Sequence, residues 1–325
     1  MVVLRLKDIQ KPIVKELAQF EQHFKESLRS SAPLLDKITR YIVKTKGKQM
    51  RPMFVFFSAG VCGKITESTY TGASLVELLH TATLIHDDVV DNANERRGFF
   101  SVNALWKNKI AVLVGDYLLS KGLLLSVKNK EFTILEIVSH AVEQMSEGEL
   151  LQIEKARHMD IEEDIYYEVI RKKTASLIAS CCACGASSAG ADKETVELFH
   201  NFGEKIGLAF QIKDDLFDFG VDDVGKPLGN DIKEKKLTLP LIYAINQLSW
   251  YEKRKILKTI KNHNDNTDTI LKIIEFVRNS GGMDYAQNKM EQFQSEAFDI
   301  LKKFPESPYK TGLEQLVEFT TNRKK

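Results

Sequence analysis

Two clusters of aspartates repeat the same spacing at two distant points of the sequence. In chain order they are Asp87, Asp88 and Asp91, then Asp214, Asp215 and Asp218. On a helix, the first and last carboxylates of such a cluster lie one turn apart on one face. Carboxylates this close repel one another, and hard oxygen ligands suit Mg²⁺. A single cluster could be a solvated charged face. Two clusters facing each other across a bundle would instead hold several Mg²⁺ ions around a diphosphate.

Basic residues follow or precede both clusters and could balance an anionic ligand. They are Lys48, Arg51, Arg96, Arg97, Lys173, Lys226 and Lys236. Taken one at a time, each is better explained as a surface charge. His80 stands seven residues before Asp87, so a helix would place both on nearly the same face. A lone histidine on an apolar face is more often a core residue than a ligand.

Helices are the elements that must position these residues. The chain has 7 prolines and none between Pro52 and Pro227, with few hairpin signals. Apolar residues recur at helical spacing over residues 134–152, 165–183 and 195–217. No linker or low-complexity tract divides the chain. We therefore expect one all-α domain over residues 1–325, a single large helical bundle of about ten or more helices.

The overall composition excludes two classes of protein. Apolar residues make up 43% of the chain, which provides enough material for a core and argues against disorder. Lys and Arg total 46 and Asp and Glu total 45, for a net charge of +1. A nucleic-acid-binding protein would show a surplus of basic residues, so we expect no nucleic-acid partner.

Neither a membrane span nor a metal-binding cysteine set is favoured. Residues 110–127 form the most apolar stretch, but Asp116 and Lys121 within it favour a buried core helix. The first residues lack the pattern of a secretory signal. Four cysteines occur, at Cys62, Cys181, Cys182 and Cys184. The Cys181/Cys184 spacing could suit a redox or zinc pair, but no second pair completes a site. The small residues around them favour close helix packing, and we expect a reducing, cytoplasmic location.

The ordered set of motifs resembles the trans-type isoprenyl (polyprenyl) diphosphate synthases. From about Lys44 to Tyr243 the chain carries G-K-x-x-R-P, H-x6-D-D, two D-D-x-x-D clusters, R-R-G, K-T and G-K-P, in family order. We expect a long-chain member of this family, such as an octaprenyl diphosphate synthase. One departure is Lys46, where many relatives have a glycine. The resemblance implies an all-α bundle around a central cavity, Mg²⁺ dependence and a homodimer. It also implies a peripheral membrane contact for product release and no transmembrane segment.

The resemblance also implies a role for each motif residue. The main metal ligands would be Asp87, Asp91 and Asp214, supported by Asp88, Asp215 and Asp218. The allylic diphosphate would be held by Arg96, Lys173, Thr174, Gln211, Lys226 and Lys236. Isopentenyl diphosphate would be held by Lys48, Arg51, His80 and Arg97. Among these, Asp87, Asp91, Asp214, Lys173 and Arg96 would act most directly in catalysis.

We expect product length to depend on side chains that precede Asp87, toward the N-terminus of the same helix. Ala82 and Thr83 precede Asp87 by five and four residues, about 6–7.5 Å along a helix. In short-chain relatives an aromatic residue near here closes the pocket. Because both residues are small, we expect a tunnel that continues past Leu79 and a product of about C40, suited to a quinone side chain. The small residues could instead only allow close packing, with a C15 or C20 product of the farnesyl or geranylgeranyl type.

Two other functions remain to be weighed. A class I terpene cyclase ionises one diphosphate and needs no second-substrate site, so Lys48, Arg51 and His80 argue against it. A non-catalytic partner subunit of a heteromeric prenyl synthase should have lost one acidic cluster. This chain keeps both.

Overall fold

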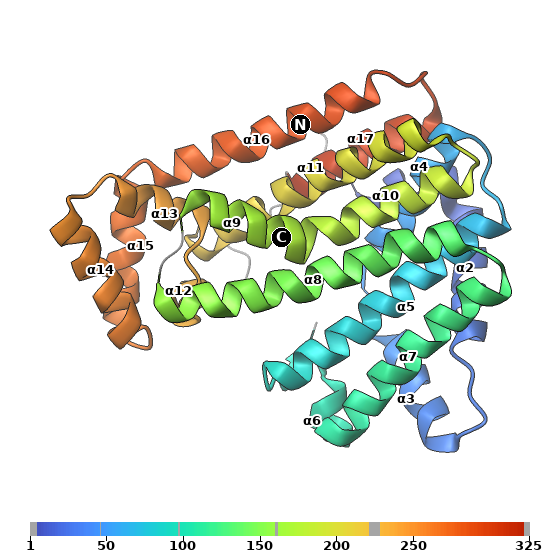
Figure 1. Cartoon of the computed structure of the whole chain (residues 1–325), viewed down its shortest axis with the longest axis horizontal. Helices are drawn as coiled ribbons and strands as arrows, with labels where there is room; N and C mark the ends of the chain where they lie inside the picture. The colour runs from blue at the N-terminus through green and yellow to red at the C-terminus, as the bar shows by residue number, and fades with distance from the viewer. Residues whose placement is uncertain (1–4, 46, 97, 160–161, 221–227, 322–325) are drawn as a thin grey trace. The chain divides into compact units, whose positions relative to one another are not determined.

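The protein is helical almost throughout, which confirms the predicted all-α class (Figure 1). The computed structural model describes residues 5–45, 47–96, 98–159, 162–220 and 228–321. Within these residues the strands are a single antiparallel pair, β1 (Glu95–Arg96) and β2 (Phe99–Phe100). Arg96 is therefore held in a tight turn that follows the first aspartate helix.

The described chain divides into two compact units. Unit 1 comprises residues 1–142, 180–200 and 304–313, and unit 2 comprises residues 143–179, 201–303 and 314–325. The first acidic cluster belongs to unit 1 and the second to unit 2. Each unit therefore carries its own set of candidate site residues, and each is described separately.

Unit 1 is built around a helix that is apolar on all sides. Its elements are α1 (Leu6–Ile9), η1 (Lys11–Ile13), α2 (Val14–Ser27), α3 (Pro33–Lys44), α4 (Met50–Cys62), α5 (Glu67–Val90), β1, β2, α6 (Val102–Trp106) and α7 (Asn108–Lys128), with the first part of α8 (Phe132–His158), the end of α10 (Ser176–Ser188), the start of α11 (Lys193–Asp218) and the start of α17 (Pro308–Thr321). Every residue from Pro52 to Ala59 on α4 is buried. A helix that is apolar all round belongs in a core. On α4 the aromatic rings of Phe54, Phe56 and Phe57 supply much of that buried surface.

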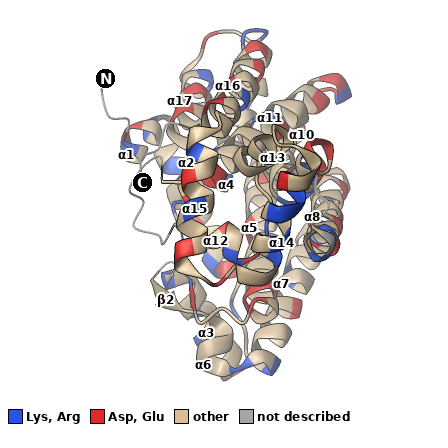
Figure 2. Cartoon of the chain, turned by 90° about the vertical axis from the view of Figure 1, so that its left-hand side faces the viewer, with Lys and Arg blue, Asp and Glu red and all other residues tan. Residues whose placement is uncertain are grey.

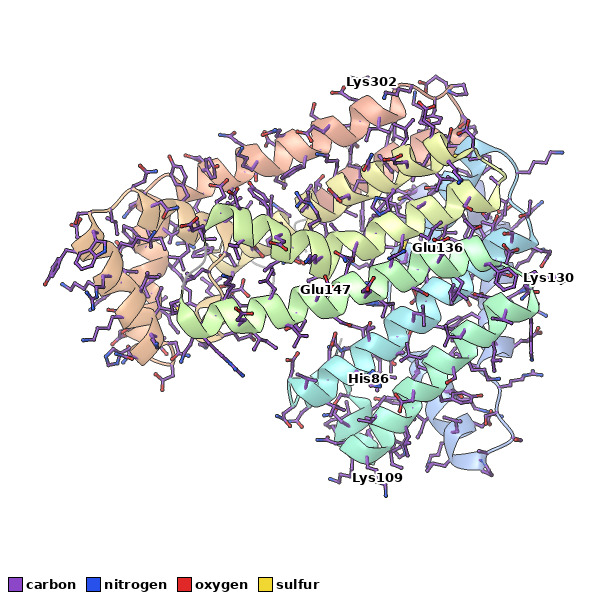
Figure 3. All side chains as sticks on the ribbon, in the orientation of Figure 1. His86, Lys109, Lys130, Glu136, Glu147 and Lys302 are labelled. Carbon is purple, nitrogen blue, oxygen red and sulfur yellow. The ribbon has the colours of Figure 1, made fainter. Side chains whose placement is uncertain are left out.

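The long helix α5 is fixed against α7 by two glycines. A Cβ atom at Gly115 would lie 2.2 Å from the Nε2 atom of His86, and one at Gly122 would lie 3.3 Å from a Leu79 methyl group. A larger side chain at either glycine would therefore require side chains of α5 to move. Figure 3 shows His86 on α5, beside α7. This packing sets the rotation of α5 about its axis, and so the direction in which its last turn presents Asp87.

The helix α7 is buried on one face only. By length and composition it could cross a bilayer, yet this is weak evidence because core helices of other proteins meet the same test. Its small residues face α5, whereas Leu113 is 55% exposed and Leu124 is 52% exposed on the other side. The prediction of a buried core helix therefore holds for the α5 face and is wrong for the opposite one. Sequence hydropathy could not separate the two faces, because both are apolar.

Unit 2 contains the remaining helices and the end of the second aspartate helix. Its elements are the rest of α8, α9 (Glu163–Ile170), η2 (Arg171–Ala175), the start of α10 (Ser176–Ser188), most of α11 (Lys193–Asp218), α12 (Asn230–Lys233), α13 (Leu239–Asn246), α14 (Trp250–His263), α15 (Thr267–Asn279), α16 (Gly282–Leu301) and the last part of α17 (Pro308–Thr321). A core of aliphatic side chains from α11, α13 and α15 holds them together.

One turn of π-helix interrupts the helix that carries Lys173 and Thr174. This turn, η2, joins α9 to α10 without a break in the chain direction. The π turn packs closely against α11 at Gly207, where a Cβ atom would lie 2.4 Å from the Cα of Ala175. Single π turns of this kind occur often at functional sites. The widened turn rotates Lys173 and Thr174 relative to a regular α-helix.

The cysteines take part in packing, as the sequence predicted. All four are free thiols, and Cys181, Cys182 and Cys184 are buried on α10. In the same helix a Cβ at Gly185 would lie 2.3 Å from the carbonyl oxygen of Val55 on α4. The small residues of this segment therefore allow α10 to approach α4 closely.

Candidate active site

The first acidic cluster lies at the C-terminal end of α5. Asp87 is half-buried and Asp91 is exposed, and the Asp91 N–H donates to the Asp87 carbonyl oxygen at 2.8 Å. The C-terminus of a helix carries partial negative charge, so carboxylates in its last turn are unfavourable without a cation. The prediction that Asp87 and Asp91 share one face of the helix end is confirmed. Their placement suits a divalent ion that reaches them from solvent.

The third carboxylate of this cluster has a different environment. Asp88 is 3% exposed, and its Oδ1 atom lies 2.7 Å from both the Nε and the Nη2 atoms of Arg96. Asn103 donates to the Asp88 carbonyl oxygen at 3.1 Å. A buried carboxylate needs such a partner, and removal of one member of a buried pair commonly costs about 3–5 kcal/mol. Arg96, predicted to bind an allylic diphosphate, therefore first fixes the turn after α5 to Asp88.

Three further predicted residues lie at separate points of unit 1. Lys48 is exposed in the segment before α4, and Arg51 is half-buried in the first turn of that helix. His80 is 6% exposed on α5 and lines a cavity of about 80 Å³ together with Asp88 and Arg96. The structure thus brings His80, Asp88 and Arg96 together at one cavity, whereas neither Lys48 nor Arg51 lines it. Arg97 and Lys226, predicted to bind the two diphosphates, lie outside the described residues.

The residues predicted to control product length are well packed. Ala82 is 0% exposed and Leu79 is 3% exposed, and Leu79 lies against Gly122 of α7. Thr83 is half-buried, and its hydroxyl donates to the His80 carbonyl oxygen at 2.9 Å. Of these three residues, only Thr83 has a polar side chain, and its hydroxyl is hydrogen-bonded within its own helix. Their role in product length stays a prediction.

The second acidic cluster lies at the end of α11 and is more enclosed. Asp215 is 3% exposed; its Oδ2 atom accepts a hydrogen bond from the Tyr166 hydroxyl at 2.7 Å, and its Oδ1 atom accepts one from Gln211 at 2.9 Å. Burial raises the pKa of Asp215 well above its ordinary value, and the nearby charge of Asp231 raises it further. The two hydrogen bonds favour the charged form and oppose this rise. Asp214 beside it is half-buried.

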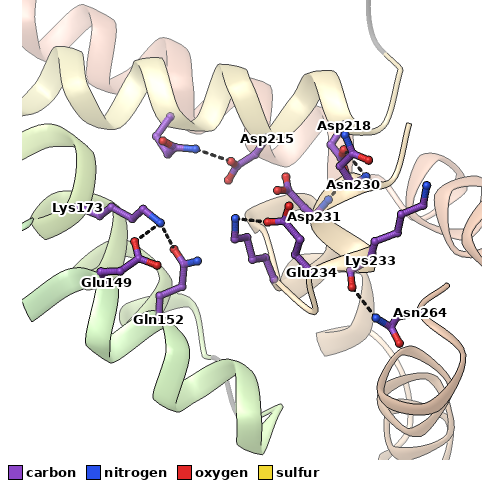
Figure 4. Close-up of polar contacts among 12 residues, drawn as sticks. Glu149, Gln152, Lys173, Asp215, Asp218, Asn230, Asp231, Lys233, Glu234 and Asn264 are labelled. Carbon is purple, nitrogen blue, oxygen red and sulfur yellow. Dashed lines mark hydrogen bonds and ion pairs between the residues drawn. The ribbon is translucent and has the colours of Figure 1, made fainter. Parts of the chain in front are cut away.

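Asp218 connects the end of α11 to the short helix α12. Its two carboxylate oxygens accept hydrogen bonds from the backbone N–H groups of Asn230 at 2.8 Å and Asp231 at 3.1 Å (Figure 4). Burial raises the pKa of Asp218, while these backbone donors lower it. Asp218 therefore has a structural role in addition to any contact with a metal ion.

The residues of unit 2 that were predicted to hold the allylic diphosphate lie on η2, on α11 and in the segment after α12. Lys173 forms an ion pair with Glu149 and donates to Gln152 at 3.3 Å (Figure 4). The Thr174 hydroxyl donates to Gln211 at 2.8 Å. Together with the Gln211–Asp215 bond, this forms a hydrogen-bonded chain from the π turn to the second cluster.

Lys236 is the remaining predicted cation of this unit. It pairs with Glu234 (Figure 4). Burial alone would lower the pKa of Lys236, but the Glu234 carboxylate, with Asp231 and Glu149 nearby, raises it above the ordinary value. Lys236 is therefore positively charged over the whole physiological range.

Comparisons with known proteins identify the family of this chain. The family model described as Polyprenyl synthetase matches residues 32–277. The chain belongs to the polyprenyl synthetase family. This confirms the family resemblance and the predicted enzyme class, a prenyltransferase that makes polyprenyl diphosphates.

Three similar proteins cover nearly the whole chain. An all-trans-nonaprenyl-diphosphate synthase (geranyl-diphosphate specific) of Rhodobacter capsulatus is 34% identical, with 97% of each chain covered. The crystal structure of a decaprenyl diphosphate synthase from Rhodobacter capsulatus has a TM-score of 0.92 and 32% identity, covering 99% of this chain and 100% of that one. The crystal structure of a geranylgeranyl pyrophosphate synthase from Bacteroides thetaiotaomicron has a TM-score of 0.82 and 37% identity, covering 98% and 99%.

Members of this family use divalent metal ions, and the carboxylates present here fit that requirement. Among the described residues, no three His, Cys, Asp or Glu side chains converge into a complete cation cage. Mg²⁺ typically takes one or two carboxylates and fills its other positions with water and phosphate oxygens. At the second cluster, burial raises the pKa of Asp215, Asp218 and Asp231, and neighbouring carboxylates raise each of them further, which indicates negative charge that a cation would stabilise.

Sequence reasoning missed several residues that this family member places beside the predicted ones. Tyr166 binds Asp215, Asp231 lies next to Asp218, and Glu149 and Gln152 hold Lys173. Burial and then the Asp218 charge raise the pKa of Asp231 to about 6. Asp231 stands 13 residues after Asp218, so the spacing of the second cluster gave no signal for it. Tyr166 carries no local signal, because 49 residues separate it from its partner.

Proposed function

We propose that the protein is a Mg²⁺-dependent, long-chain all-trans polyprenyl diphosphate synthase that condenses isopentenyl diphosphate with an allylic diphosphate. The observation that carries this proposal is the pair of carboxylate clusters at the C-terminal ends of α5 and α11, each accompanied by basic residues in its own unit. We further propose that the two units act as one catalytic domain, because the family match runs through segments of both.

The chain's own residues would bind the two substrates at different points. Lys173, Thr174 and Lys236 of unit 2, with Arg96 of unit 1, supply donors for the allylic diphosphate. Lys48, Arg51 and His80 of unit 1 supply donors for isopentenyl diphosphate. Arginine matches the fork of phosphate oxygens better than lysine does, which suits Arg51 and Arg96 to this task.

The reaction proceeds by ionisation, condensation and elimination. Mg²⁺, when bound, supplies Lewis-acid stabilisation of the negative charge that develops on the departing diphosphate. The allylic C–O bond breaks with its electron pair on that diphosphate, and the double bond of isopentenyl diphosphate attacks the resulting allylic cation. The adduct then loses a proton to the released diphosphate. Asp87 and Asp91 of unit 1 and Asp214 of unit 2 would hold Mg²⁺, and the basic residues would hold both diphosphates in place.

We propose a product of about C40, suited to a quinone side chain. The names of two of the relatives above describe nonaprenyl and decaprenyl synthases, and Ala82 and Thr83 are small. A short-chain activity is the alternative, since the geranylgeranyl synthase above is also similar. A non-catalytic partner subunit is less consistent with the chain, because both acidic clusters are intact.

We propose that the enzyme is a homodimer whose subunits meet along the exposed face of α7. That face carries Leu113, Leu123, Leu124 and Val127, each about half exposed. A contiguous apolar face of this kind is typical of a permanent interface between subunits. The four free thiols fit our proposal of a reducing, cytoplasmic location.

A single incubation tests the activity. The protein is mixed with radiolabelled isopentenyl diphosphate, an allylic primer and Mg²⁺, and the products are separated by chromatography. We expect labelled prenyl diphosphates that require both substrates and the metal ion, ending near C40. Consumption of the allylic diphosphate alone would identify a cyclase, and no turnover at all would favour a partner subunit.

A further inference from the structure

The helix α14 of unit 2 carries basic and aromatic side chains on its exposed face. It spans Trp250–His263, and Ile256, Leu257 and Ile260 attach one face to the apolar core of unit 2. The opposite face is exposed along its whole length. None of the side chains on this face belongs to the candidate active site.

Positive charge is concentrated on this helix. Its basic residues are Lys253, Arg254, Lys255, Lys258 and Lys261, against the single acidic residue Glu252. The whole chain has a net charge of only +1. Lys253 donates to Asn246 at 2.8 Å and is half-buried, so the other four form the exposed basic stripe. Figure 2 shows Lys and Arg along α14.

Two large aromatic side chains begin the same stripe. Trp250 and Tyr251 are each 72% exposed, which is more than any other large apolar side chain among the described residues. The Arg254 guanidinium lies 5.2 Å from the centre of the Trp250 ring, and this contact holds the ring beside the basic stripe. An ordinary solvated face explains exposed lysines but leaves this aromatic pair unexplained.

Aromatic and basic side chains on one helix match the surface of an anionic bilayer. Trp and Tyr place their rings at the level of the lipid headgroups, and Lys and Arg side chains bind phosphate groups while their stems cover apolar surface. The stripe is one helix wide, and acidic Asp265 and Asp268 follow the end of α14. That narrow shape suits a helix lying on a membrane better than a broad nucleic-acid footprint.

We propose that the exposed face of α14 is a docking surface for anionic lipid bilayers. The basic residues Arg254, Lys255, Lys258 and Lys261 would bind lipid phosphates, and Trp250 and Tyr251 would enter the interface. This goes beyond the proposed prenyl transfer and does not depend on it, because the docking needs neither substrate nor metal ion.

Vesicle flotation without substrates tests the proposal. The full chain is mixed with vesicles of phosphatidylcholine alone, or with about one-third phosphatidylglycerol, at low and high salt. We expect binding to the anionic vesicles, loss of that binding at high salt, and a blue shift of tryptophan fluorescence on binding that is absent in Trp250→Ala. Equal binding to both vesicle types, or none to the anionic ones at low salt, would overturn the proposal.

Matched variants separate this surface from general charge. The double variant Lys255→Ala/Lys258→Ala should weaken partitioning by about 25-fold, since each basic residue contributes about fivefold. The control Lys302→Ala/Lys303→Ala makes the same change in net charge on exposed residues at the end of α16 (Figure 3), and should change partitioning by less than about twofold. If the control weakens binding as much as the α14 variant, then net charge and not α14 is responsible.

A third variant isolates the aromatic pair. Trp250→Ala/Tyr251→Ala keeps every charge and should still weaken partitioning by about tenfold or more. Unchanged binding would show that the aromatics take no part. Retention on double-stranded DNA without vesicle binding would instead assign the stripe to nucleic acid and contradict the proposal. Circular dichroism and prenyl transfer by each variant without vesicles should match the unmodified protein, which excludes misfolding as the cause.

Discussion

The hydroxyl of Tyr166 on α9 donates a 2.7 Å hydrogen bond to the Oδ2 atom of Asp215 on α11. Because Gln211 donates to the other carboxylate oxygen at 2.9 Å, both oxygens of Asp215 have donors from the protein. Tyr166 and Asp215 are both buried, so the Asp215 carboxylate has little freedom to rotate. A residue held in this way positions its neighbours Asp214 and Asp218 more than it offers a free ligand itself.

Replacement of Tyr166 by Phe should therefore impair metal binding while preserving the fold. The substitution removes one hydrogen bond to a carboxylate and keeps the ring that packs against Tyr167. Loss of a group that orients metal ligands typically costs about 10–100-fold in metal affinity or activity. We expect the Mg²⁺ concentration for half-maximal rate to rise by about tenfold or more, and Mn²⁺ binding followed by electron paramagnetic resonance to weaken in parallel.

The adjacent residue provides the control for this prediction. Tyr167→Phe makes the same chemical change one position along α9, where the side chain packs against Phe293 and the hydrogen bond to Asp215 comes from Tyr166 instead. It should leave the Mg²⁺ dependence unchanged. A similar rise in both variants would mean that α9 matters only through packing.

Asp87→Ala and Asp214→Ala should each reduce the rate by several orders of magnitude. Both substitutions remove carboxylates that we assign to the metal ions, which act mainly where the leaving charge develops. Neither side chain is fully buried, so helicity measured by circular dichroism should be retained. Asp299→Ala, at an exposed ion pair with Lys302, is the control and should turn over normally. Near-normal activity in either cluster variant would contradict the metal assignment.

The sequence predicted the elements that carry local patterns. The spacing of Asp87 and Asp91, and of Asp214 and Asp218, specifies one helix face, and the structure places both clusters at helix ends. The expected helix over residues 195–217 is α11, Lys193–Asp218. These features depend on periodicity within a few turns, which a sequence displays directly.

Features that depend on distant contacts could not be predicted in this way. Asp88 and Arg96 were both expected to contact ligands, yet they bind each other across a turn. The π turn at Lys173 appears in the sequence only as an interruption of an apolar helix. Tyr166 has no neighbour in the sequence that indicates its partner. Each of these follows from tertiary packing, which overrides local preference and leaves no periodic pattern.

Disruption of the exposed face of α7 should separate the proposed dimer. Leu124→Glu places a charge on a side chain that is 52% exposed in the single chain, so the fold should tolerate it. Light scattering coupled to gel filtration should then report a monomer in place of a dimer. Leu271→Glu on α15 is a matched control, because Leu271 is also 52% exposed, and it should remain dimeric. A dimeric Leu124→Glu protein would place the interface elsewhere.

The cysteines should be unreactive until the chain unfolds. Burial raises the pKa of the Cys62 thiol to about 12, and burial raises the pKa of the Cys181 thiol to about 12 as well. Because the thiolate is the nucleophile, a raised pKa leaves little reactive form at mildly alkaline pH. Iodoacetamide should modify none of the four thiols in the native protein and all four in denaturant, as counted by mass spectrometry. Rapid native labelling of Cys181 would contradict the packing role of α10.

Product length should respond to side-chain size at position 82. If the growing chain extends along α5 toward its N-terminus, then a larger side chain at Ala82 blocks it without touching a diphosphate ligand. The series Ala82→Leu and Ala82→Phe should therefore shorten the product in steps while the first condensation continues. Ala82 is fully buried, so overpacking should also cost about 1–3 kcal/mol of stability, and the melting temperature of each variant must be measured.

A matched variant on the opposite side of α5 distinguishes blockage from general damage. Leu84 is half-buried and lines the small cavity with His80 and Asp88, away from the Leu79 side that packs on α7. Leu84→Phe should lower stability by a comparable amount yet leave the product distribution near C40. If both variants shorten the product equally, loss of stability is the cause. If unmodified enzyme stops at C15 or C20, or Ala82→Phe changes nothing, then the small residues at positions 82 and 83 serve only helix packing and the chain is capped elsewhere.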